Sequence, residues 1–437
     1  MRRIAVTGVG AVTPLGLDVG AFWRGLLEGK SGVSFITDFP TDKLRSDIAA
    51  RVDGLDPERF LTKKESELFG RVAQFSVAAA TEAVDQAGFA SWLEEGIPGG
   101  DLTAEQRAQL PKPDVDPTRF GCLMSTGQGA VDIFEQQIAK SADRGPRAVS
   151  PFFIPSVMPN NPSAMVSMRY GLMGPSYGLS SACATGTHSI ATCAMMIALD
   201  EADVMVAGGA EAATRLNTVA GFGNARALTK AWEGDPTRAS RPFDVGRRGF
   251  VMGEGAGVLV LEAEEHAKAR GAEILAYVAG WGLTSDGQHL TSPHADGLGV
   301  RIAMERALKR AGITPDDVGY INPHATSTKL GDVAEIRALR QVFGDRLPKT
   351  PISATKSMVG HLLGGAGAVE SIATICSLRD GKLHPSINLD ELDPELAPLD
   401  VVLGGPRDVD ARYALKISAG FGGHNCALVF ERASDRA

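Results

Sequence analysis

The chain has 437 residues, which at roughly 150 residues per domain is enough for about three small domains or two large ones. Hydrophobic residues make up 44% of it and charged residues 22%, which excludes a disordered chain, a collagen-like repeat and a coiled coil as the main architecture. The formal net charge of −8 disfavours nucleic acid or an anionic membrane as a partner for the whole surface.

Short apolar runs alternate with alanine-rich periodic segments, which is typical of an α/β protein. The run from Ile4 to Val12 continues without the small-residue end of a signal peptide, so it predicts a first buried strand. Similar runs at 204–207 and 258–261 predict further buried strands. Helices are predicted over 69–87 and 300–311, each followed by a glycine that suits a C-terminal cap.

Two further segments are less regular. Residues 92–119 mix prolines and glycines with acidic residues and predict a surface insertion. Residues 170–199 carry no charge and are long enough to span a bilayer, but their glycines, hydroxyls and His188 favour a buried core segment. We therefore expect no membrane-spanning segment.

One tetrapeptide recurs in the two halves of the chain. Residues 189–192 and 371–374 share the sequence Ser-Ile-Ala-Thr, each inside an apolar run that follows glycines and alanines. The two copies of the tetrapeptide lie about half the chain length apart. Two similar α/β halves that meet near residues 273–277 would explain this spacing. Coincidence between small-residue helices explains four matching residues equally well.

The five cysteines are widely spaced without a CxxC pair, which argues against a disulfide framework or a zinc site and fits a reducing, cytoplasmic compartment. Cys183 differs because it lies in a small-residue turn just before an apolar run, so we expect it at the start of a helix. The helix dipole and free N–H groups there would lower the thiol pKa and hold an oxyanion. A buried structural thiol is the alternative, and it is our interpretation of Cys122, Cys193, Cys376 and Cys426.

All eight histidines lie at or after position 188. His324, His361 and His424 occupy loop-like or glycine-rich settings, and their presence together with Cys183 favours nucleophilic catalysis over isolated surface histidines. Nucleotide binding is disfavoured, because residues 421–423 lack the GKS/T continuation of a phosphate loop and Gly8-Val9-Gly10 lacks the third glycine of a dinucleotide site.

These residues lie in motifs that resemble those of the β-ketoacyl-acyl-carrier-protein synthases, in particular the elongating type II group. The resemblance is nearly full length, with motifs at 3–10, 181–183, 203–209, 324–332, 356–370 and 420–425. It implies a thiolase-like α/β fold of five layers, α-β-α-β-α, built from two related halves. These would be residues 1–275 with the cysteine and residues 276–437 with the histidines, and the resemblance further implies a homodimer.

The resemblance also implies a decarboxylative Claisen condensation in fatty acid elongation. Cys183 would take an acyl group from a carrier-protein thioester, malonyl carrier protein would lose CO₂, and the resulting carbanion would attack the acyl group. N–H groups of His324 and His361 would hold the enolate oxygen, and the backbone N–H groups of Cys183 and Phe421 would hold the tetrahedral oxyanion. No metal and no organic cofactor is implied.

Other positions match residues with supporting roles in that family. Around the catalytic centre these are the active-site lysine, three acidic residues and two hydroxyls for the pantetheine arm: Lys356, Asp332, Glu335, Glu370, Thr326 and Thr328. Because the carrier protein is acidic in such systems, we expect a complementary basic docking patch. Its expected members are Lys63, Lys64, Arg226 and Lys230.

Two positions depart from the family pattern. Ala419 replaces a bulky ring close to Phe421, and Gln128 stands where an apolar residue or a glycine lines the acyl pocket. A buried amide there would cost about 1–3 kcal/mol without a hydrogen-bond partner. We therefore expect a shorter or more polar acyl chain than in ordinary fatty acid elongation.

Two alternative functions stay open. A ketosynthase of a polyketide or other secondary pathway would need the same catalytic residues. A non-catalytic chain-length partner would need none of Cys183, His324 and His361. A degradative thiolase is disfavoured, because Cys426 lies in a different motif from the second cysteine that such an enzyme requires.

Overall fold

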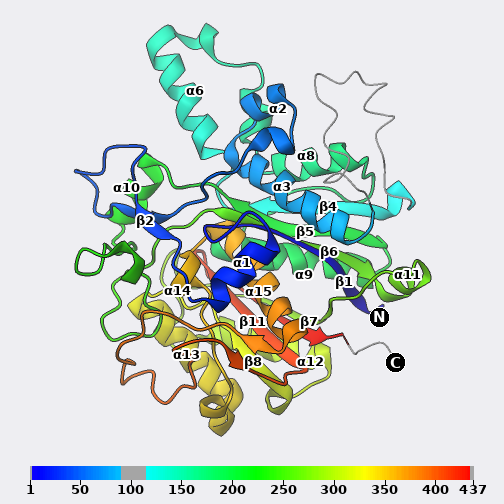
Figure 1. The fold of residues 1–437 in the computed structure, drawn as a ribbon, viewed down its shortest axis with the longest axis vertical. Helices are drawn as coiled ribbons and strands as arrows, with labels where there is room; N and C mark the ends of the chain where they lie inside the picture. Colours follow the sequence, from blue (N-terminus) through cyan, green and yellow to red (C-terminus); the bar gives the residue numbers. More distant parts are fainter. Residues whose placement is uncertain (1, 90–114, 434–437) are drawn as a thin grey trace.

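The computed structural model describes residues 2–89 and 115–433 of the chain. Eight strands form one hydrogen-bonded sheet in the order β4-β5-β6-β1-β7-β12-β11-β8 (Figure 1). The first half of the sheet consists of β4 (Phe120–Thr126), β5 (Val204–Glu211), β6 (Gly255–Ala263) and β1 (Ile4–Val12). The second half consists of β7 (Ala276–Ser285), β12 (His424–Arg432), β11 (Tyr413–Gly420) and β8 (Val318–Asn322).

The two halves of the sheet repeat one topology. In each half the two outermost strands run parallel, β4 with β5 and β8 with β11, whereas all other neighbours run antiparallel. The halves join where β1 and β7 pair, with Ala5 opposite Tyr277 and Val6 opposite Ala276. The chain is therefore built from two related halves, as predicted.

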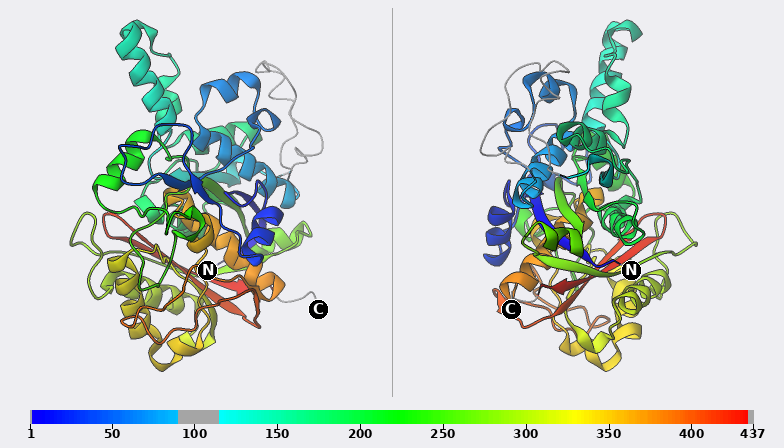
Figure 2. Two further views of the ribbon diagram at one scale, coloured as in Figure 1. Left: turned by 60° about the vertical axis from the view of Figure 1, so that its left-hand side comes forward. Right: turned by 90° about the vertical axis from the view of Figure 1, so that its right-hand side faces the viewer.

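Helices form three layers around these strands (Figures 1 and 2). In the centre, α9 (Thr185–Ala198) and α15 (Ala366–Asp380) pack against each other and against strands of both halves. On the outer faces, α3 (Arg71–Gln86) and α8 (Asn161–Tyr170) cover the first half, and α12 (Leu298–Ala311) and α13 (Lys329–Phe343) cover the second. The result is the predicted α-β-α-β-α arrangement.

The repeated tetrapeptide lies in equivalent elements. Residues 189–192 belong to α9 and residues 371–374 to α15, and each helix directly follows a short 3-10 turn. The two helices approach closely, since a Cβ atom on Gly186 would lie 2.8 Å from the Ala368 nitrogen. This shared position in the central layer favours related halves over coincidence.

Other sequence predictions can be compared directly with these elements. Every residue of β1 is buried, and the predicted helices over 69–87 and 300–311 correspond to α3 and α12. Residues 170–199 include the central helix α9, and no helix of the described residues is long and apolar enough to cross a membrane. The predicted insertion at 92–119 falls mostly outside the described residues.

The remaining elements lie at the periphery or in connections. The helices are α1 (Val19–Leu27), α2 (Lys63–Leu68), α6 (Val131–Arg144), α7 (Phe153–Val157), α10 (Leu216–Asn224), α11 (Glu264–Ala269) and α14 (Lys356–Val359). Two small strand pairs are β2 (Val33–Phe35) with β3 (Ile48–Ala50) and β9 (Lys382–Leu383) with β10 (Arg407–Asp408).

Candidate active site

Cys183 lies in the 3-10 turn Ala182–Ala184, immediately before α9, so its predicted position at a helix start is confirmed. The backbone N–H groups of Cys183 and Phe421 both approach the thiol. The end of β11 packs tightly here, because a Cβ atom on Gly420 would lie 2.6 Å from the Ser181 oxygen and 3.1 Å from the Cys183 nitrogen. Only a glycine lets the Phe421 N–H come so near to the sulfur.

The predicted lowering of the Cys183 pKa is wrong for the free protein. Burial raises the pKa of this thiol to about 11, because a thiolate loses its solvation there. The Phe421 N–H and the Lys356 cation act in the opposite direction, whereas the Glu211 carboxyl raises the pKa further. The resting group is therefore the neutral thiol, and its proton must leave as the nucleophile attacks.

A cavity of about 440 Å³ adjoins the thiol. Its wall is formed by the turn after β4, the helix α10 and the two loops that carry Leu363 and Phe421. Most of the lining side chains are small or apolar, which suits an apolar chain. The lining residues include Gly127, Gln128, Cys183, Glu211, Phe222 and Phe421.

A series of ring contacts links this cavity to the two predicted histidines. The ring centroid of Phe222 lies 6.2 Å from that of Phe421 and 5.4 Å from that of Phe250. Phe250 in turn contacts His361 at 5.2 Å, and His361 contacts His324 edge-to-face at 5.3 Å. The structure thus brings Cys183 and both histidines into one site from distant parts of the sequence.

Both histidines are neutral in this environment. Burial lowers the pKa of His324 and of His361 well below the usual value, and the Lys356 cation lowers each further. Lys356 Nζ lies 3.4 Å from His324 Nδ1, so Nδ1 is the acceptor and the ring proton resides on Nε2. Neither ring nitrogen of His361 has a hydrogen-bond partner within the described part of the chain, which leaves that ring available to a substrate.

Two of the acidic residues predicted around the site stabilise its local structure. Glu370 forms a buried ion pair with Lys356. Glu335 accepts the backbone N–H groups of His324 at 2.5 Å and Ala325 at 2.8 Å, which fixes the loop that carries His324. Burial raises the pKa of Glu335, and neither carboxyl lines the cavity.

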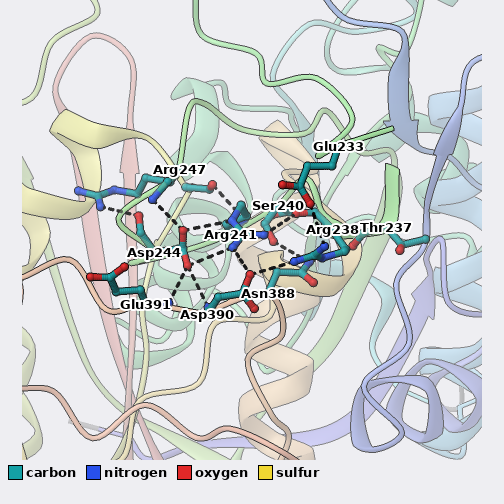
Figure 3. Close-up of polar contacts among 12 residues, drawn as sticks. Glu233, Thr237, Arg238, Ser240, Arg241, Asp244, Arg247, Asn388, Asp390 and Glu391 are labelled. Atoms are coloured by element: carbon teal, nitrogen blue, oxygen red, sulfur yellow. Dashed lines mark hydrogen bonds and ion pairs between the residues drawn. The ribbon is translucent and has the colours of Figure 1, made fainter. Parts of the chain in front are cut away.

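Asp332 fixes a second loop. It accepts the Phe243 N–H at 3.0 Å and faces Arg247 Nε at 3.4 Å, and burial raises its pKa to about 7. Figure 3 shows that Arg247 belongs to a larger polar network, in which Asp244 bonds to Arg241 and to the backbone N–H of Asp390. This network ties the segment before Phe250 to the 388–393 segment, so Asp332 supports the site from outside the cavity.

Of the four predicted substrate-binding residues, only Gln128 lines the cavity of Cys183. The hydroxyls of Thr326 and Thr328 lie 3.0 Å apart, but neither residue lines the cavity of Cys183. Ala419 packs against the core of the second half and does not line it either. Gln128 does line the cavity, and its side chain is exposed in the single chain. The expectation of a shorter or more polar acyl chain stays a prediction.

Two charged residues of the site were missed by sequence reasoning. Glu211, at the end of β5, is fully buried beside the cavity and accepts N–H groups of Gly127 and Gly364 at 3.0 Å. Burial raises its pKa to about 7. Lys416, in β11, binds the second oxygen of Glu370. The only sequence signal for either residue was one charged side chain in an otherwise apolar strand. Glu211 stands at the end of its strand and Lys416 within its strand.

The predicted docking residues are all exposed but lie in two places. Lys63 and Lys64 begin α2, whereas Arg226 and Lys230 follow α10. The latter two line a second cavity, of about 280 Å³, together with Arg45, Arg248 and Trp232.

Comparison with known protein families identifies the chain. The family described as Beta-ketoacyl synthase, N-terminal domain, matches residues 1–96 and 103–267, and its C-terminal domain matches residues 275–390. The chain belongs to the β-ketoacyl synthase family, as the sequence motifs predicted. The N-terminal match is interrupted between residues 96 and 103, so part of the predicted 92–119 insertion lies within the family match and part outside it.

Individual relatives agree with this assignment. The chain is 42% identical to 3-oxoacyl-[acyl-carrier-protein] synthase 2 of Vibrio harveyi, over 99% of both chains. It is 39% identical to the protein of the same name from Staphylococcus aureus strain N315, over 99% of this chain and 98% of the relative. A β-ketoacyl synthase from Burkholderia phymatum has a similar structure, with a TM-score of 0.88 and 35% identity over 99% of this chain and 100% of that one.

Ketosynthases of secondary pathways share the fold at lower identity. A type II polyketide ketosynthase in complex with its acyl-carrier protein aligns with a TM-score of 0.87 and 30% identity, over 99% of this chain and 100% of that one. The higher identity to synthases named 3-oxoacyl-[acyl-carrier-protein] synthase 2 favours the main prediction over a secondary-pathway ketosynthase.

Proposed function

We propose that the chain condenses an acyl group held on Cys183 with malonyl carrier protein, giving 3-oxoacyl carrier protein and CO₂ in fatty acid elongation. The observation that carries this proposal is the convergence of one buried thiol, two backbone N–H groups and two neutral buried histidines beside an apolar cavity. Such a site is suited to acyl transfer, since it supplies a nucleophile and N–H donors for developing oxyanions.

In the first half-reaction the Cys183 sulfur attacks the thioester carbonyl. The N–H groups of Cys183 and Phe421 hold the oxyanion, the carbon–sulfur bond to the carrier breaks, and the thiol proton leaves with the carrier thiolate. In the second, the bond between the malonyl carboxylate and C2 breaks and CO₂ leaves. Its electron pair forms an enolate, whose oxygen accepts hydrogen bonds from His324 Nε2 and from His361. The C2 carbanion then attacks the acyl carbonyl and releases the Cys183 thiolate, which takes up a proton.

Intact-protein mass spectrometry after incubation with acyl carrier proteins of several chain lengths tests this function. Wild type should gain the mass of the acyl group, whereas Cys183→Ala should gain nothing. Cys193→Ala, which removes another buried thiol of α9, should acylate like wild type. An adduct of equal size on Cys183→Ala, or none on wild type with any donor, would overturn the proposal.

We further propose that the carrier protein docks at the basic cavity beside α10. Arg45, Arg226, Lys230 and Arg248 line it, and none of the four forms an ion pair among residues 2–89 and 115–433. The same helix α10 lines the Cys183 cavity, so a carrier bound here lies next to the acyl site. Arg226→Glu should raise the KM for acyl carrier at least tenfold with kcat unchanged, as expected when one ion pair across an interface is reversed. Lys309→Glu, on the outer helix α12, should leave KM unchanged.

A second copy of the chain is proposed to cover α6 and its surroundings. This helix projects from the body of the molecule in all three views (Figures 1 and 2), and Gln137 is its only buried residue. Phe134 and Ile138, one turn apart on α6, are 49% and 54% exposed, and Ile154 on α7 is 58% exposed. Such grouped apolar side chains are typical of a protein interface.

A further inference from the structure

Lys416 is a buried cation within an apolar strand. It lies in β11 between Leu415 and Ile417, and none of its surface is exposed. Replacing a whole buried ion pair by apolar residues is often neutral or stabilising, so stability alone gives no reason for a buried lysine and its carboxylate partner here. The contacts of its ammonium group indicate what it does.

The Lys416 ammonium joins the supporting residues of the site to the loop that carries Phe421. Nζ lies 2.7 Å from Glu370 Oε2, and it donates to the Ile417 oxygen and, at 3.2 Å, to Ser418 Oγ. Ser418 Oγ in turn lies 2.7 Å from Thr187 Oγ1 in α9, four residues after Cys183. Lys416 therefore contacts Glu370 of α15 directly and is linked through Ser418 to α9, the helix that follows the nucleophile.

Glu370 is shared between two lysines. Its Oε1 binds Lys356, the residue that faces His324 Nδ1 at 3.4 Å, and its Oε2 binds Lys416. Burial lowers the pKa of Lys416 and the Lys356 cation lowers it further, whereas the Glu370 carboxylate opposes this shift and favours the charged ammonium. With Oε2 occupied, the carboxylate is fixed in the orientation that presents Oε1 to Lys356.

The charges around Lys416 balance only when it is present. The groups that face it are the Lys356 cation, the carboxyls of Glu370 and Glu335, the neutral rings of His324 and His361, and the Cys426 thiol on β12. Two lysines therefore face two carboxylates. Without Lys416 one lysine would face both, and the negative excess would favour protonation of the histidines.

We propose that Lys416 is a positioning residue of the condensing site, which holds Glu370 from its second oxygen and supplies the second buried positive charge. Through its ion pair with Glu370, Lys416 holds the Lys356 ammonium group next to the His324 ring. Its charge also keeps His324 and His361 neutral at lower pH, and only the neutral tautomer with the proton on Nε2 matches the Lys356 contact. This inference rests on the proposed condensing function.

The pH dependence of malonyl carrier decarboxylation tests the proposal, measured on wild type, Lys416→Met and Lys416→Gln. Both substitutions remove the charge, and glutamine retains a donor for Ser418. The acid limb of the rate profile should move to higher pH by about one unit in each variant, the size of shift that one neighbouring charge produces. Lys309→Met, the same chemical change on the exposed surface of α12, should leave the profile unchanged.

The outcomes separate this proposal from the function on which it rests. If wild type neither acylates Cys183 nor decarboxylates malonyl carrier, the proposed function fails. If wild type is active and a folded variant loses thermal stability but keeps the wild-type acid limb, Lys416 is merely structural and the inference is overturned. Should Lys416→Met fail to fold, Lys416→Gln decides by the same shift. If neither neutral variant folds, Lys416→Arg keeps the charge and should retain the wild-type acid limb; a displaced limb overturns the inference.

Discussion

Gly420 controls how closely the Phe421 N–H approaches the Cys183 thiol. Gly420→Ala would place a Cβ atom 2.6 Å from the Ser181 oxygen, which is backbone and cannot move without shifting the loop. Relief of such a contact costs about 1–3 kcal/mol, equivalent to a loss of roughly fivefold to 150-fold in rate when it displaces an oxyanion donor. We expect the acylation rate of Cys183, followed by intact mass, to fall by that factor.

The neighbouring alanine provides the control for this prediction. Ala419→Gly removes a methyl group that packs on the core and creates no contact near the thiol. It should lower stability slightly and leave the acylation rate within about twofold of wild type. An acylation rate for Gly420→Ala equal to wild type would show that the loop tolerates a side chain there.

At the residue scale, the sequence indicated Cys183 through the small-residue turn before an apolar run, and Phe421 through the family resemblance of its glycine-rich segment. Their catalytic roles stay predictions. Glu211 and Lys416 were missed because their role depends on burial and on partners that only the folded chain brings near. The thiol pKa was predicted in the wrong direction for the same reason, since burial outweighs the nearby N–H groups.

At the scale of elements, the close packing of α9 against α15 fixes how the two halves of the site lie relative to each other. A Cβ atom on Gly367 of α15 would lie 1.9 Å from Thr187 Oγ1 and 2.7 Å from the Thr187 nitrogen. Gly367→Ala should therefore lower the free energy of unfolding by about 1–3 kcal/mol or more, despite the higher helix propensity of alanine. Denaturant unfolding of both proteins measures this difference.

The matched substitution lies in an exposed helix. Gly20 of α1 is exposed, and only the ends of two flexible side chains lie within 4 Å of the position that an added methyl group would take. Gly20→Ala should therefore change the free energy of unfolding by less than about 1 kcal/mol, because the higher helix propensity of alanine is opposed only by the 3.2 Å approach of its methyl group to the Asp18 carboxylate. Equal effects of the two substitutions would contradict the close helix crossing.

Sequence patterns predicted the elements themselves well where the apolar period was regular. β1, α3 and α12 lie where predicted, because a buried strand and an amphipathic helix each leave a distinct pattern. The order of strands within each half could not be read from local pattern, since it depends on pairings between distant segments. The boundary at residue 275/276 stays a prediction.

At the scale of the whole molecule, the exposed apolar face around α6 predicts a dimer. Phe134 and Ile138 are about half exposed in the single chain, and a symmetric interface would use each of them twice. Phe134→Glu with Ile138→Glu would place four charges in that interface, at a cost that exceeds the gain from burying the apolar groups. Light scattering after size exclusion should give twice the chain mass for wild type and the single chain mass for the double variant.

Leu330→Glu, which charges an exposed leucine of α13 in the other half, should remain dimeric. A double variant that keeps the mass of a dimer would show that the second copy binds elsewhere.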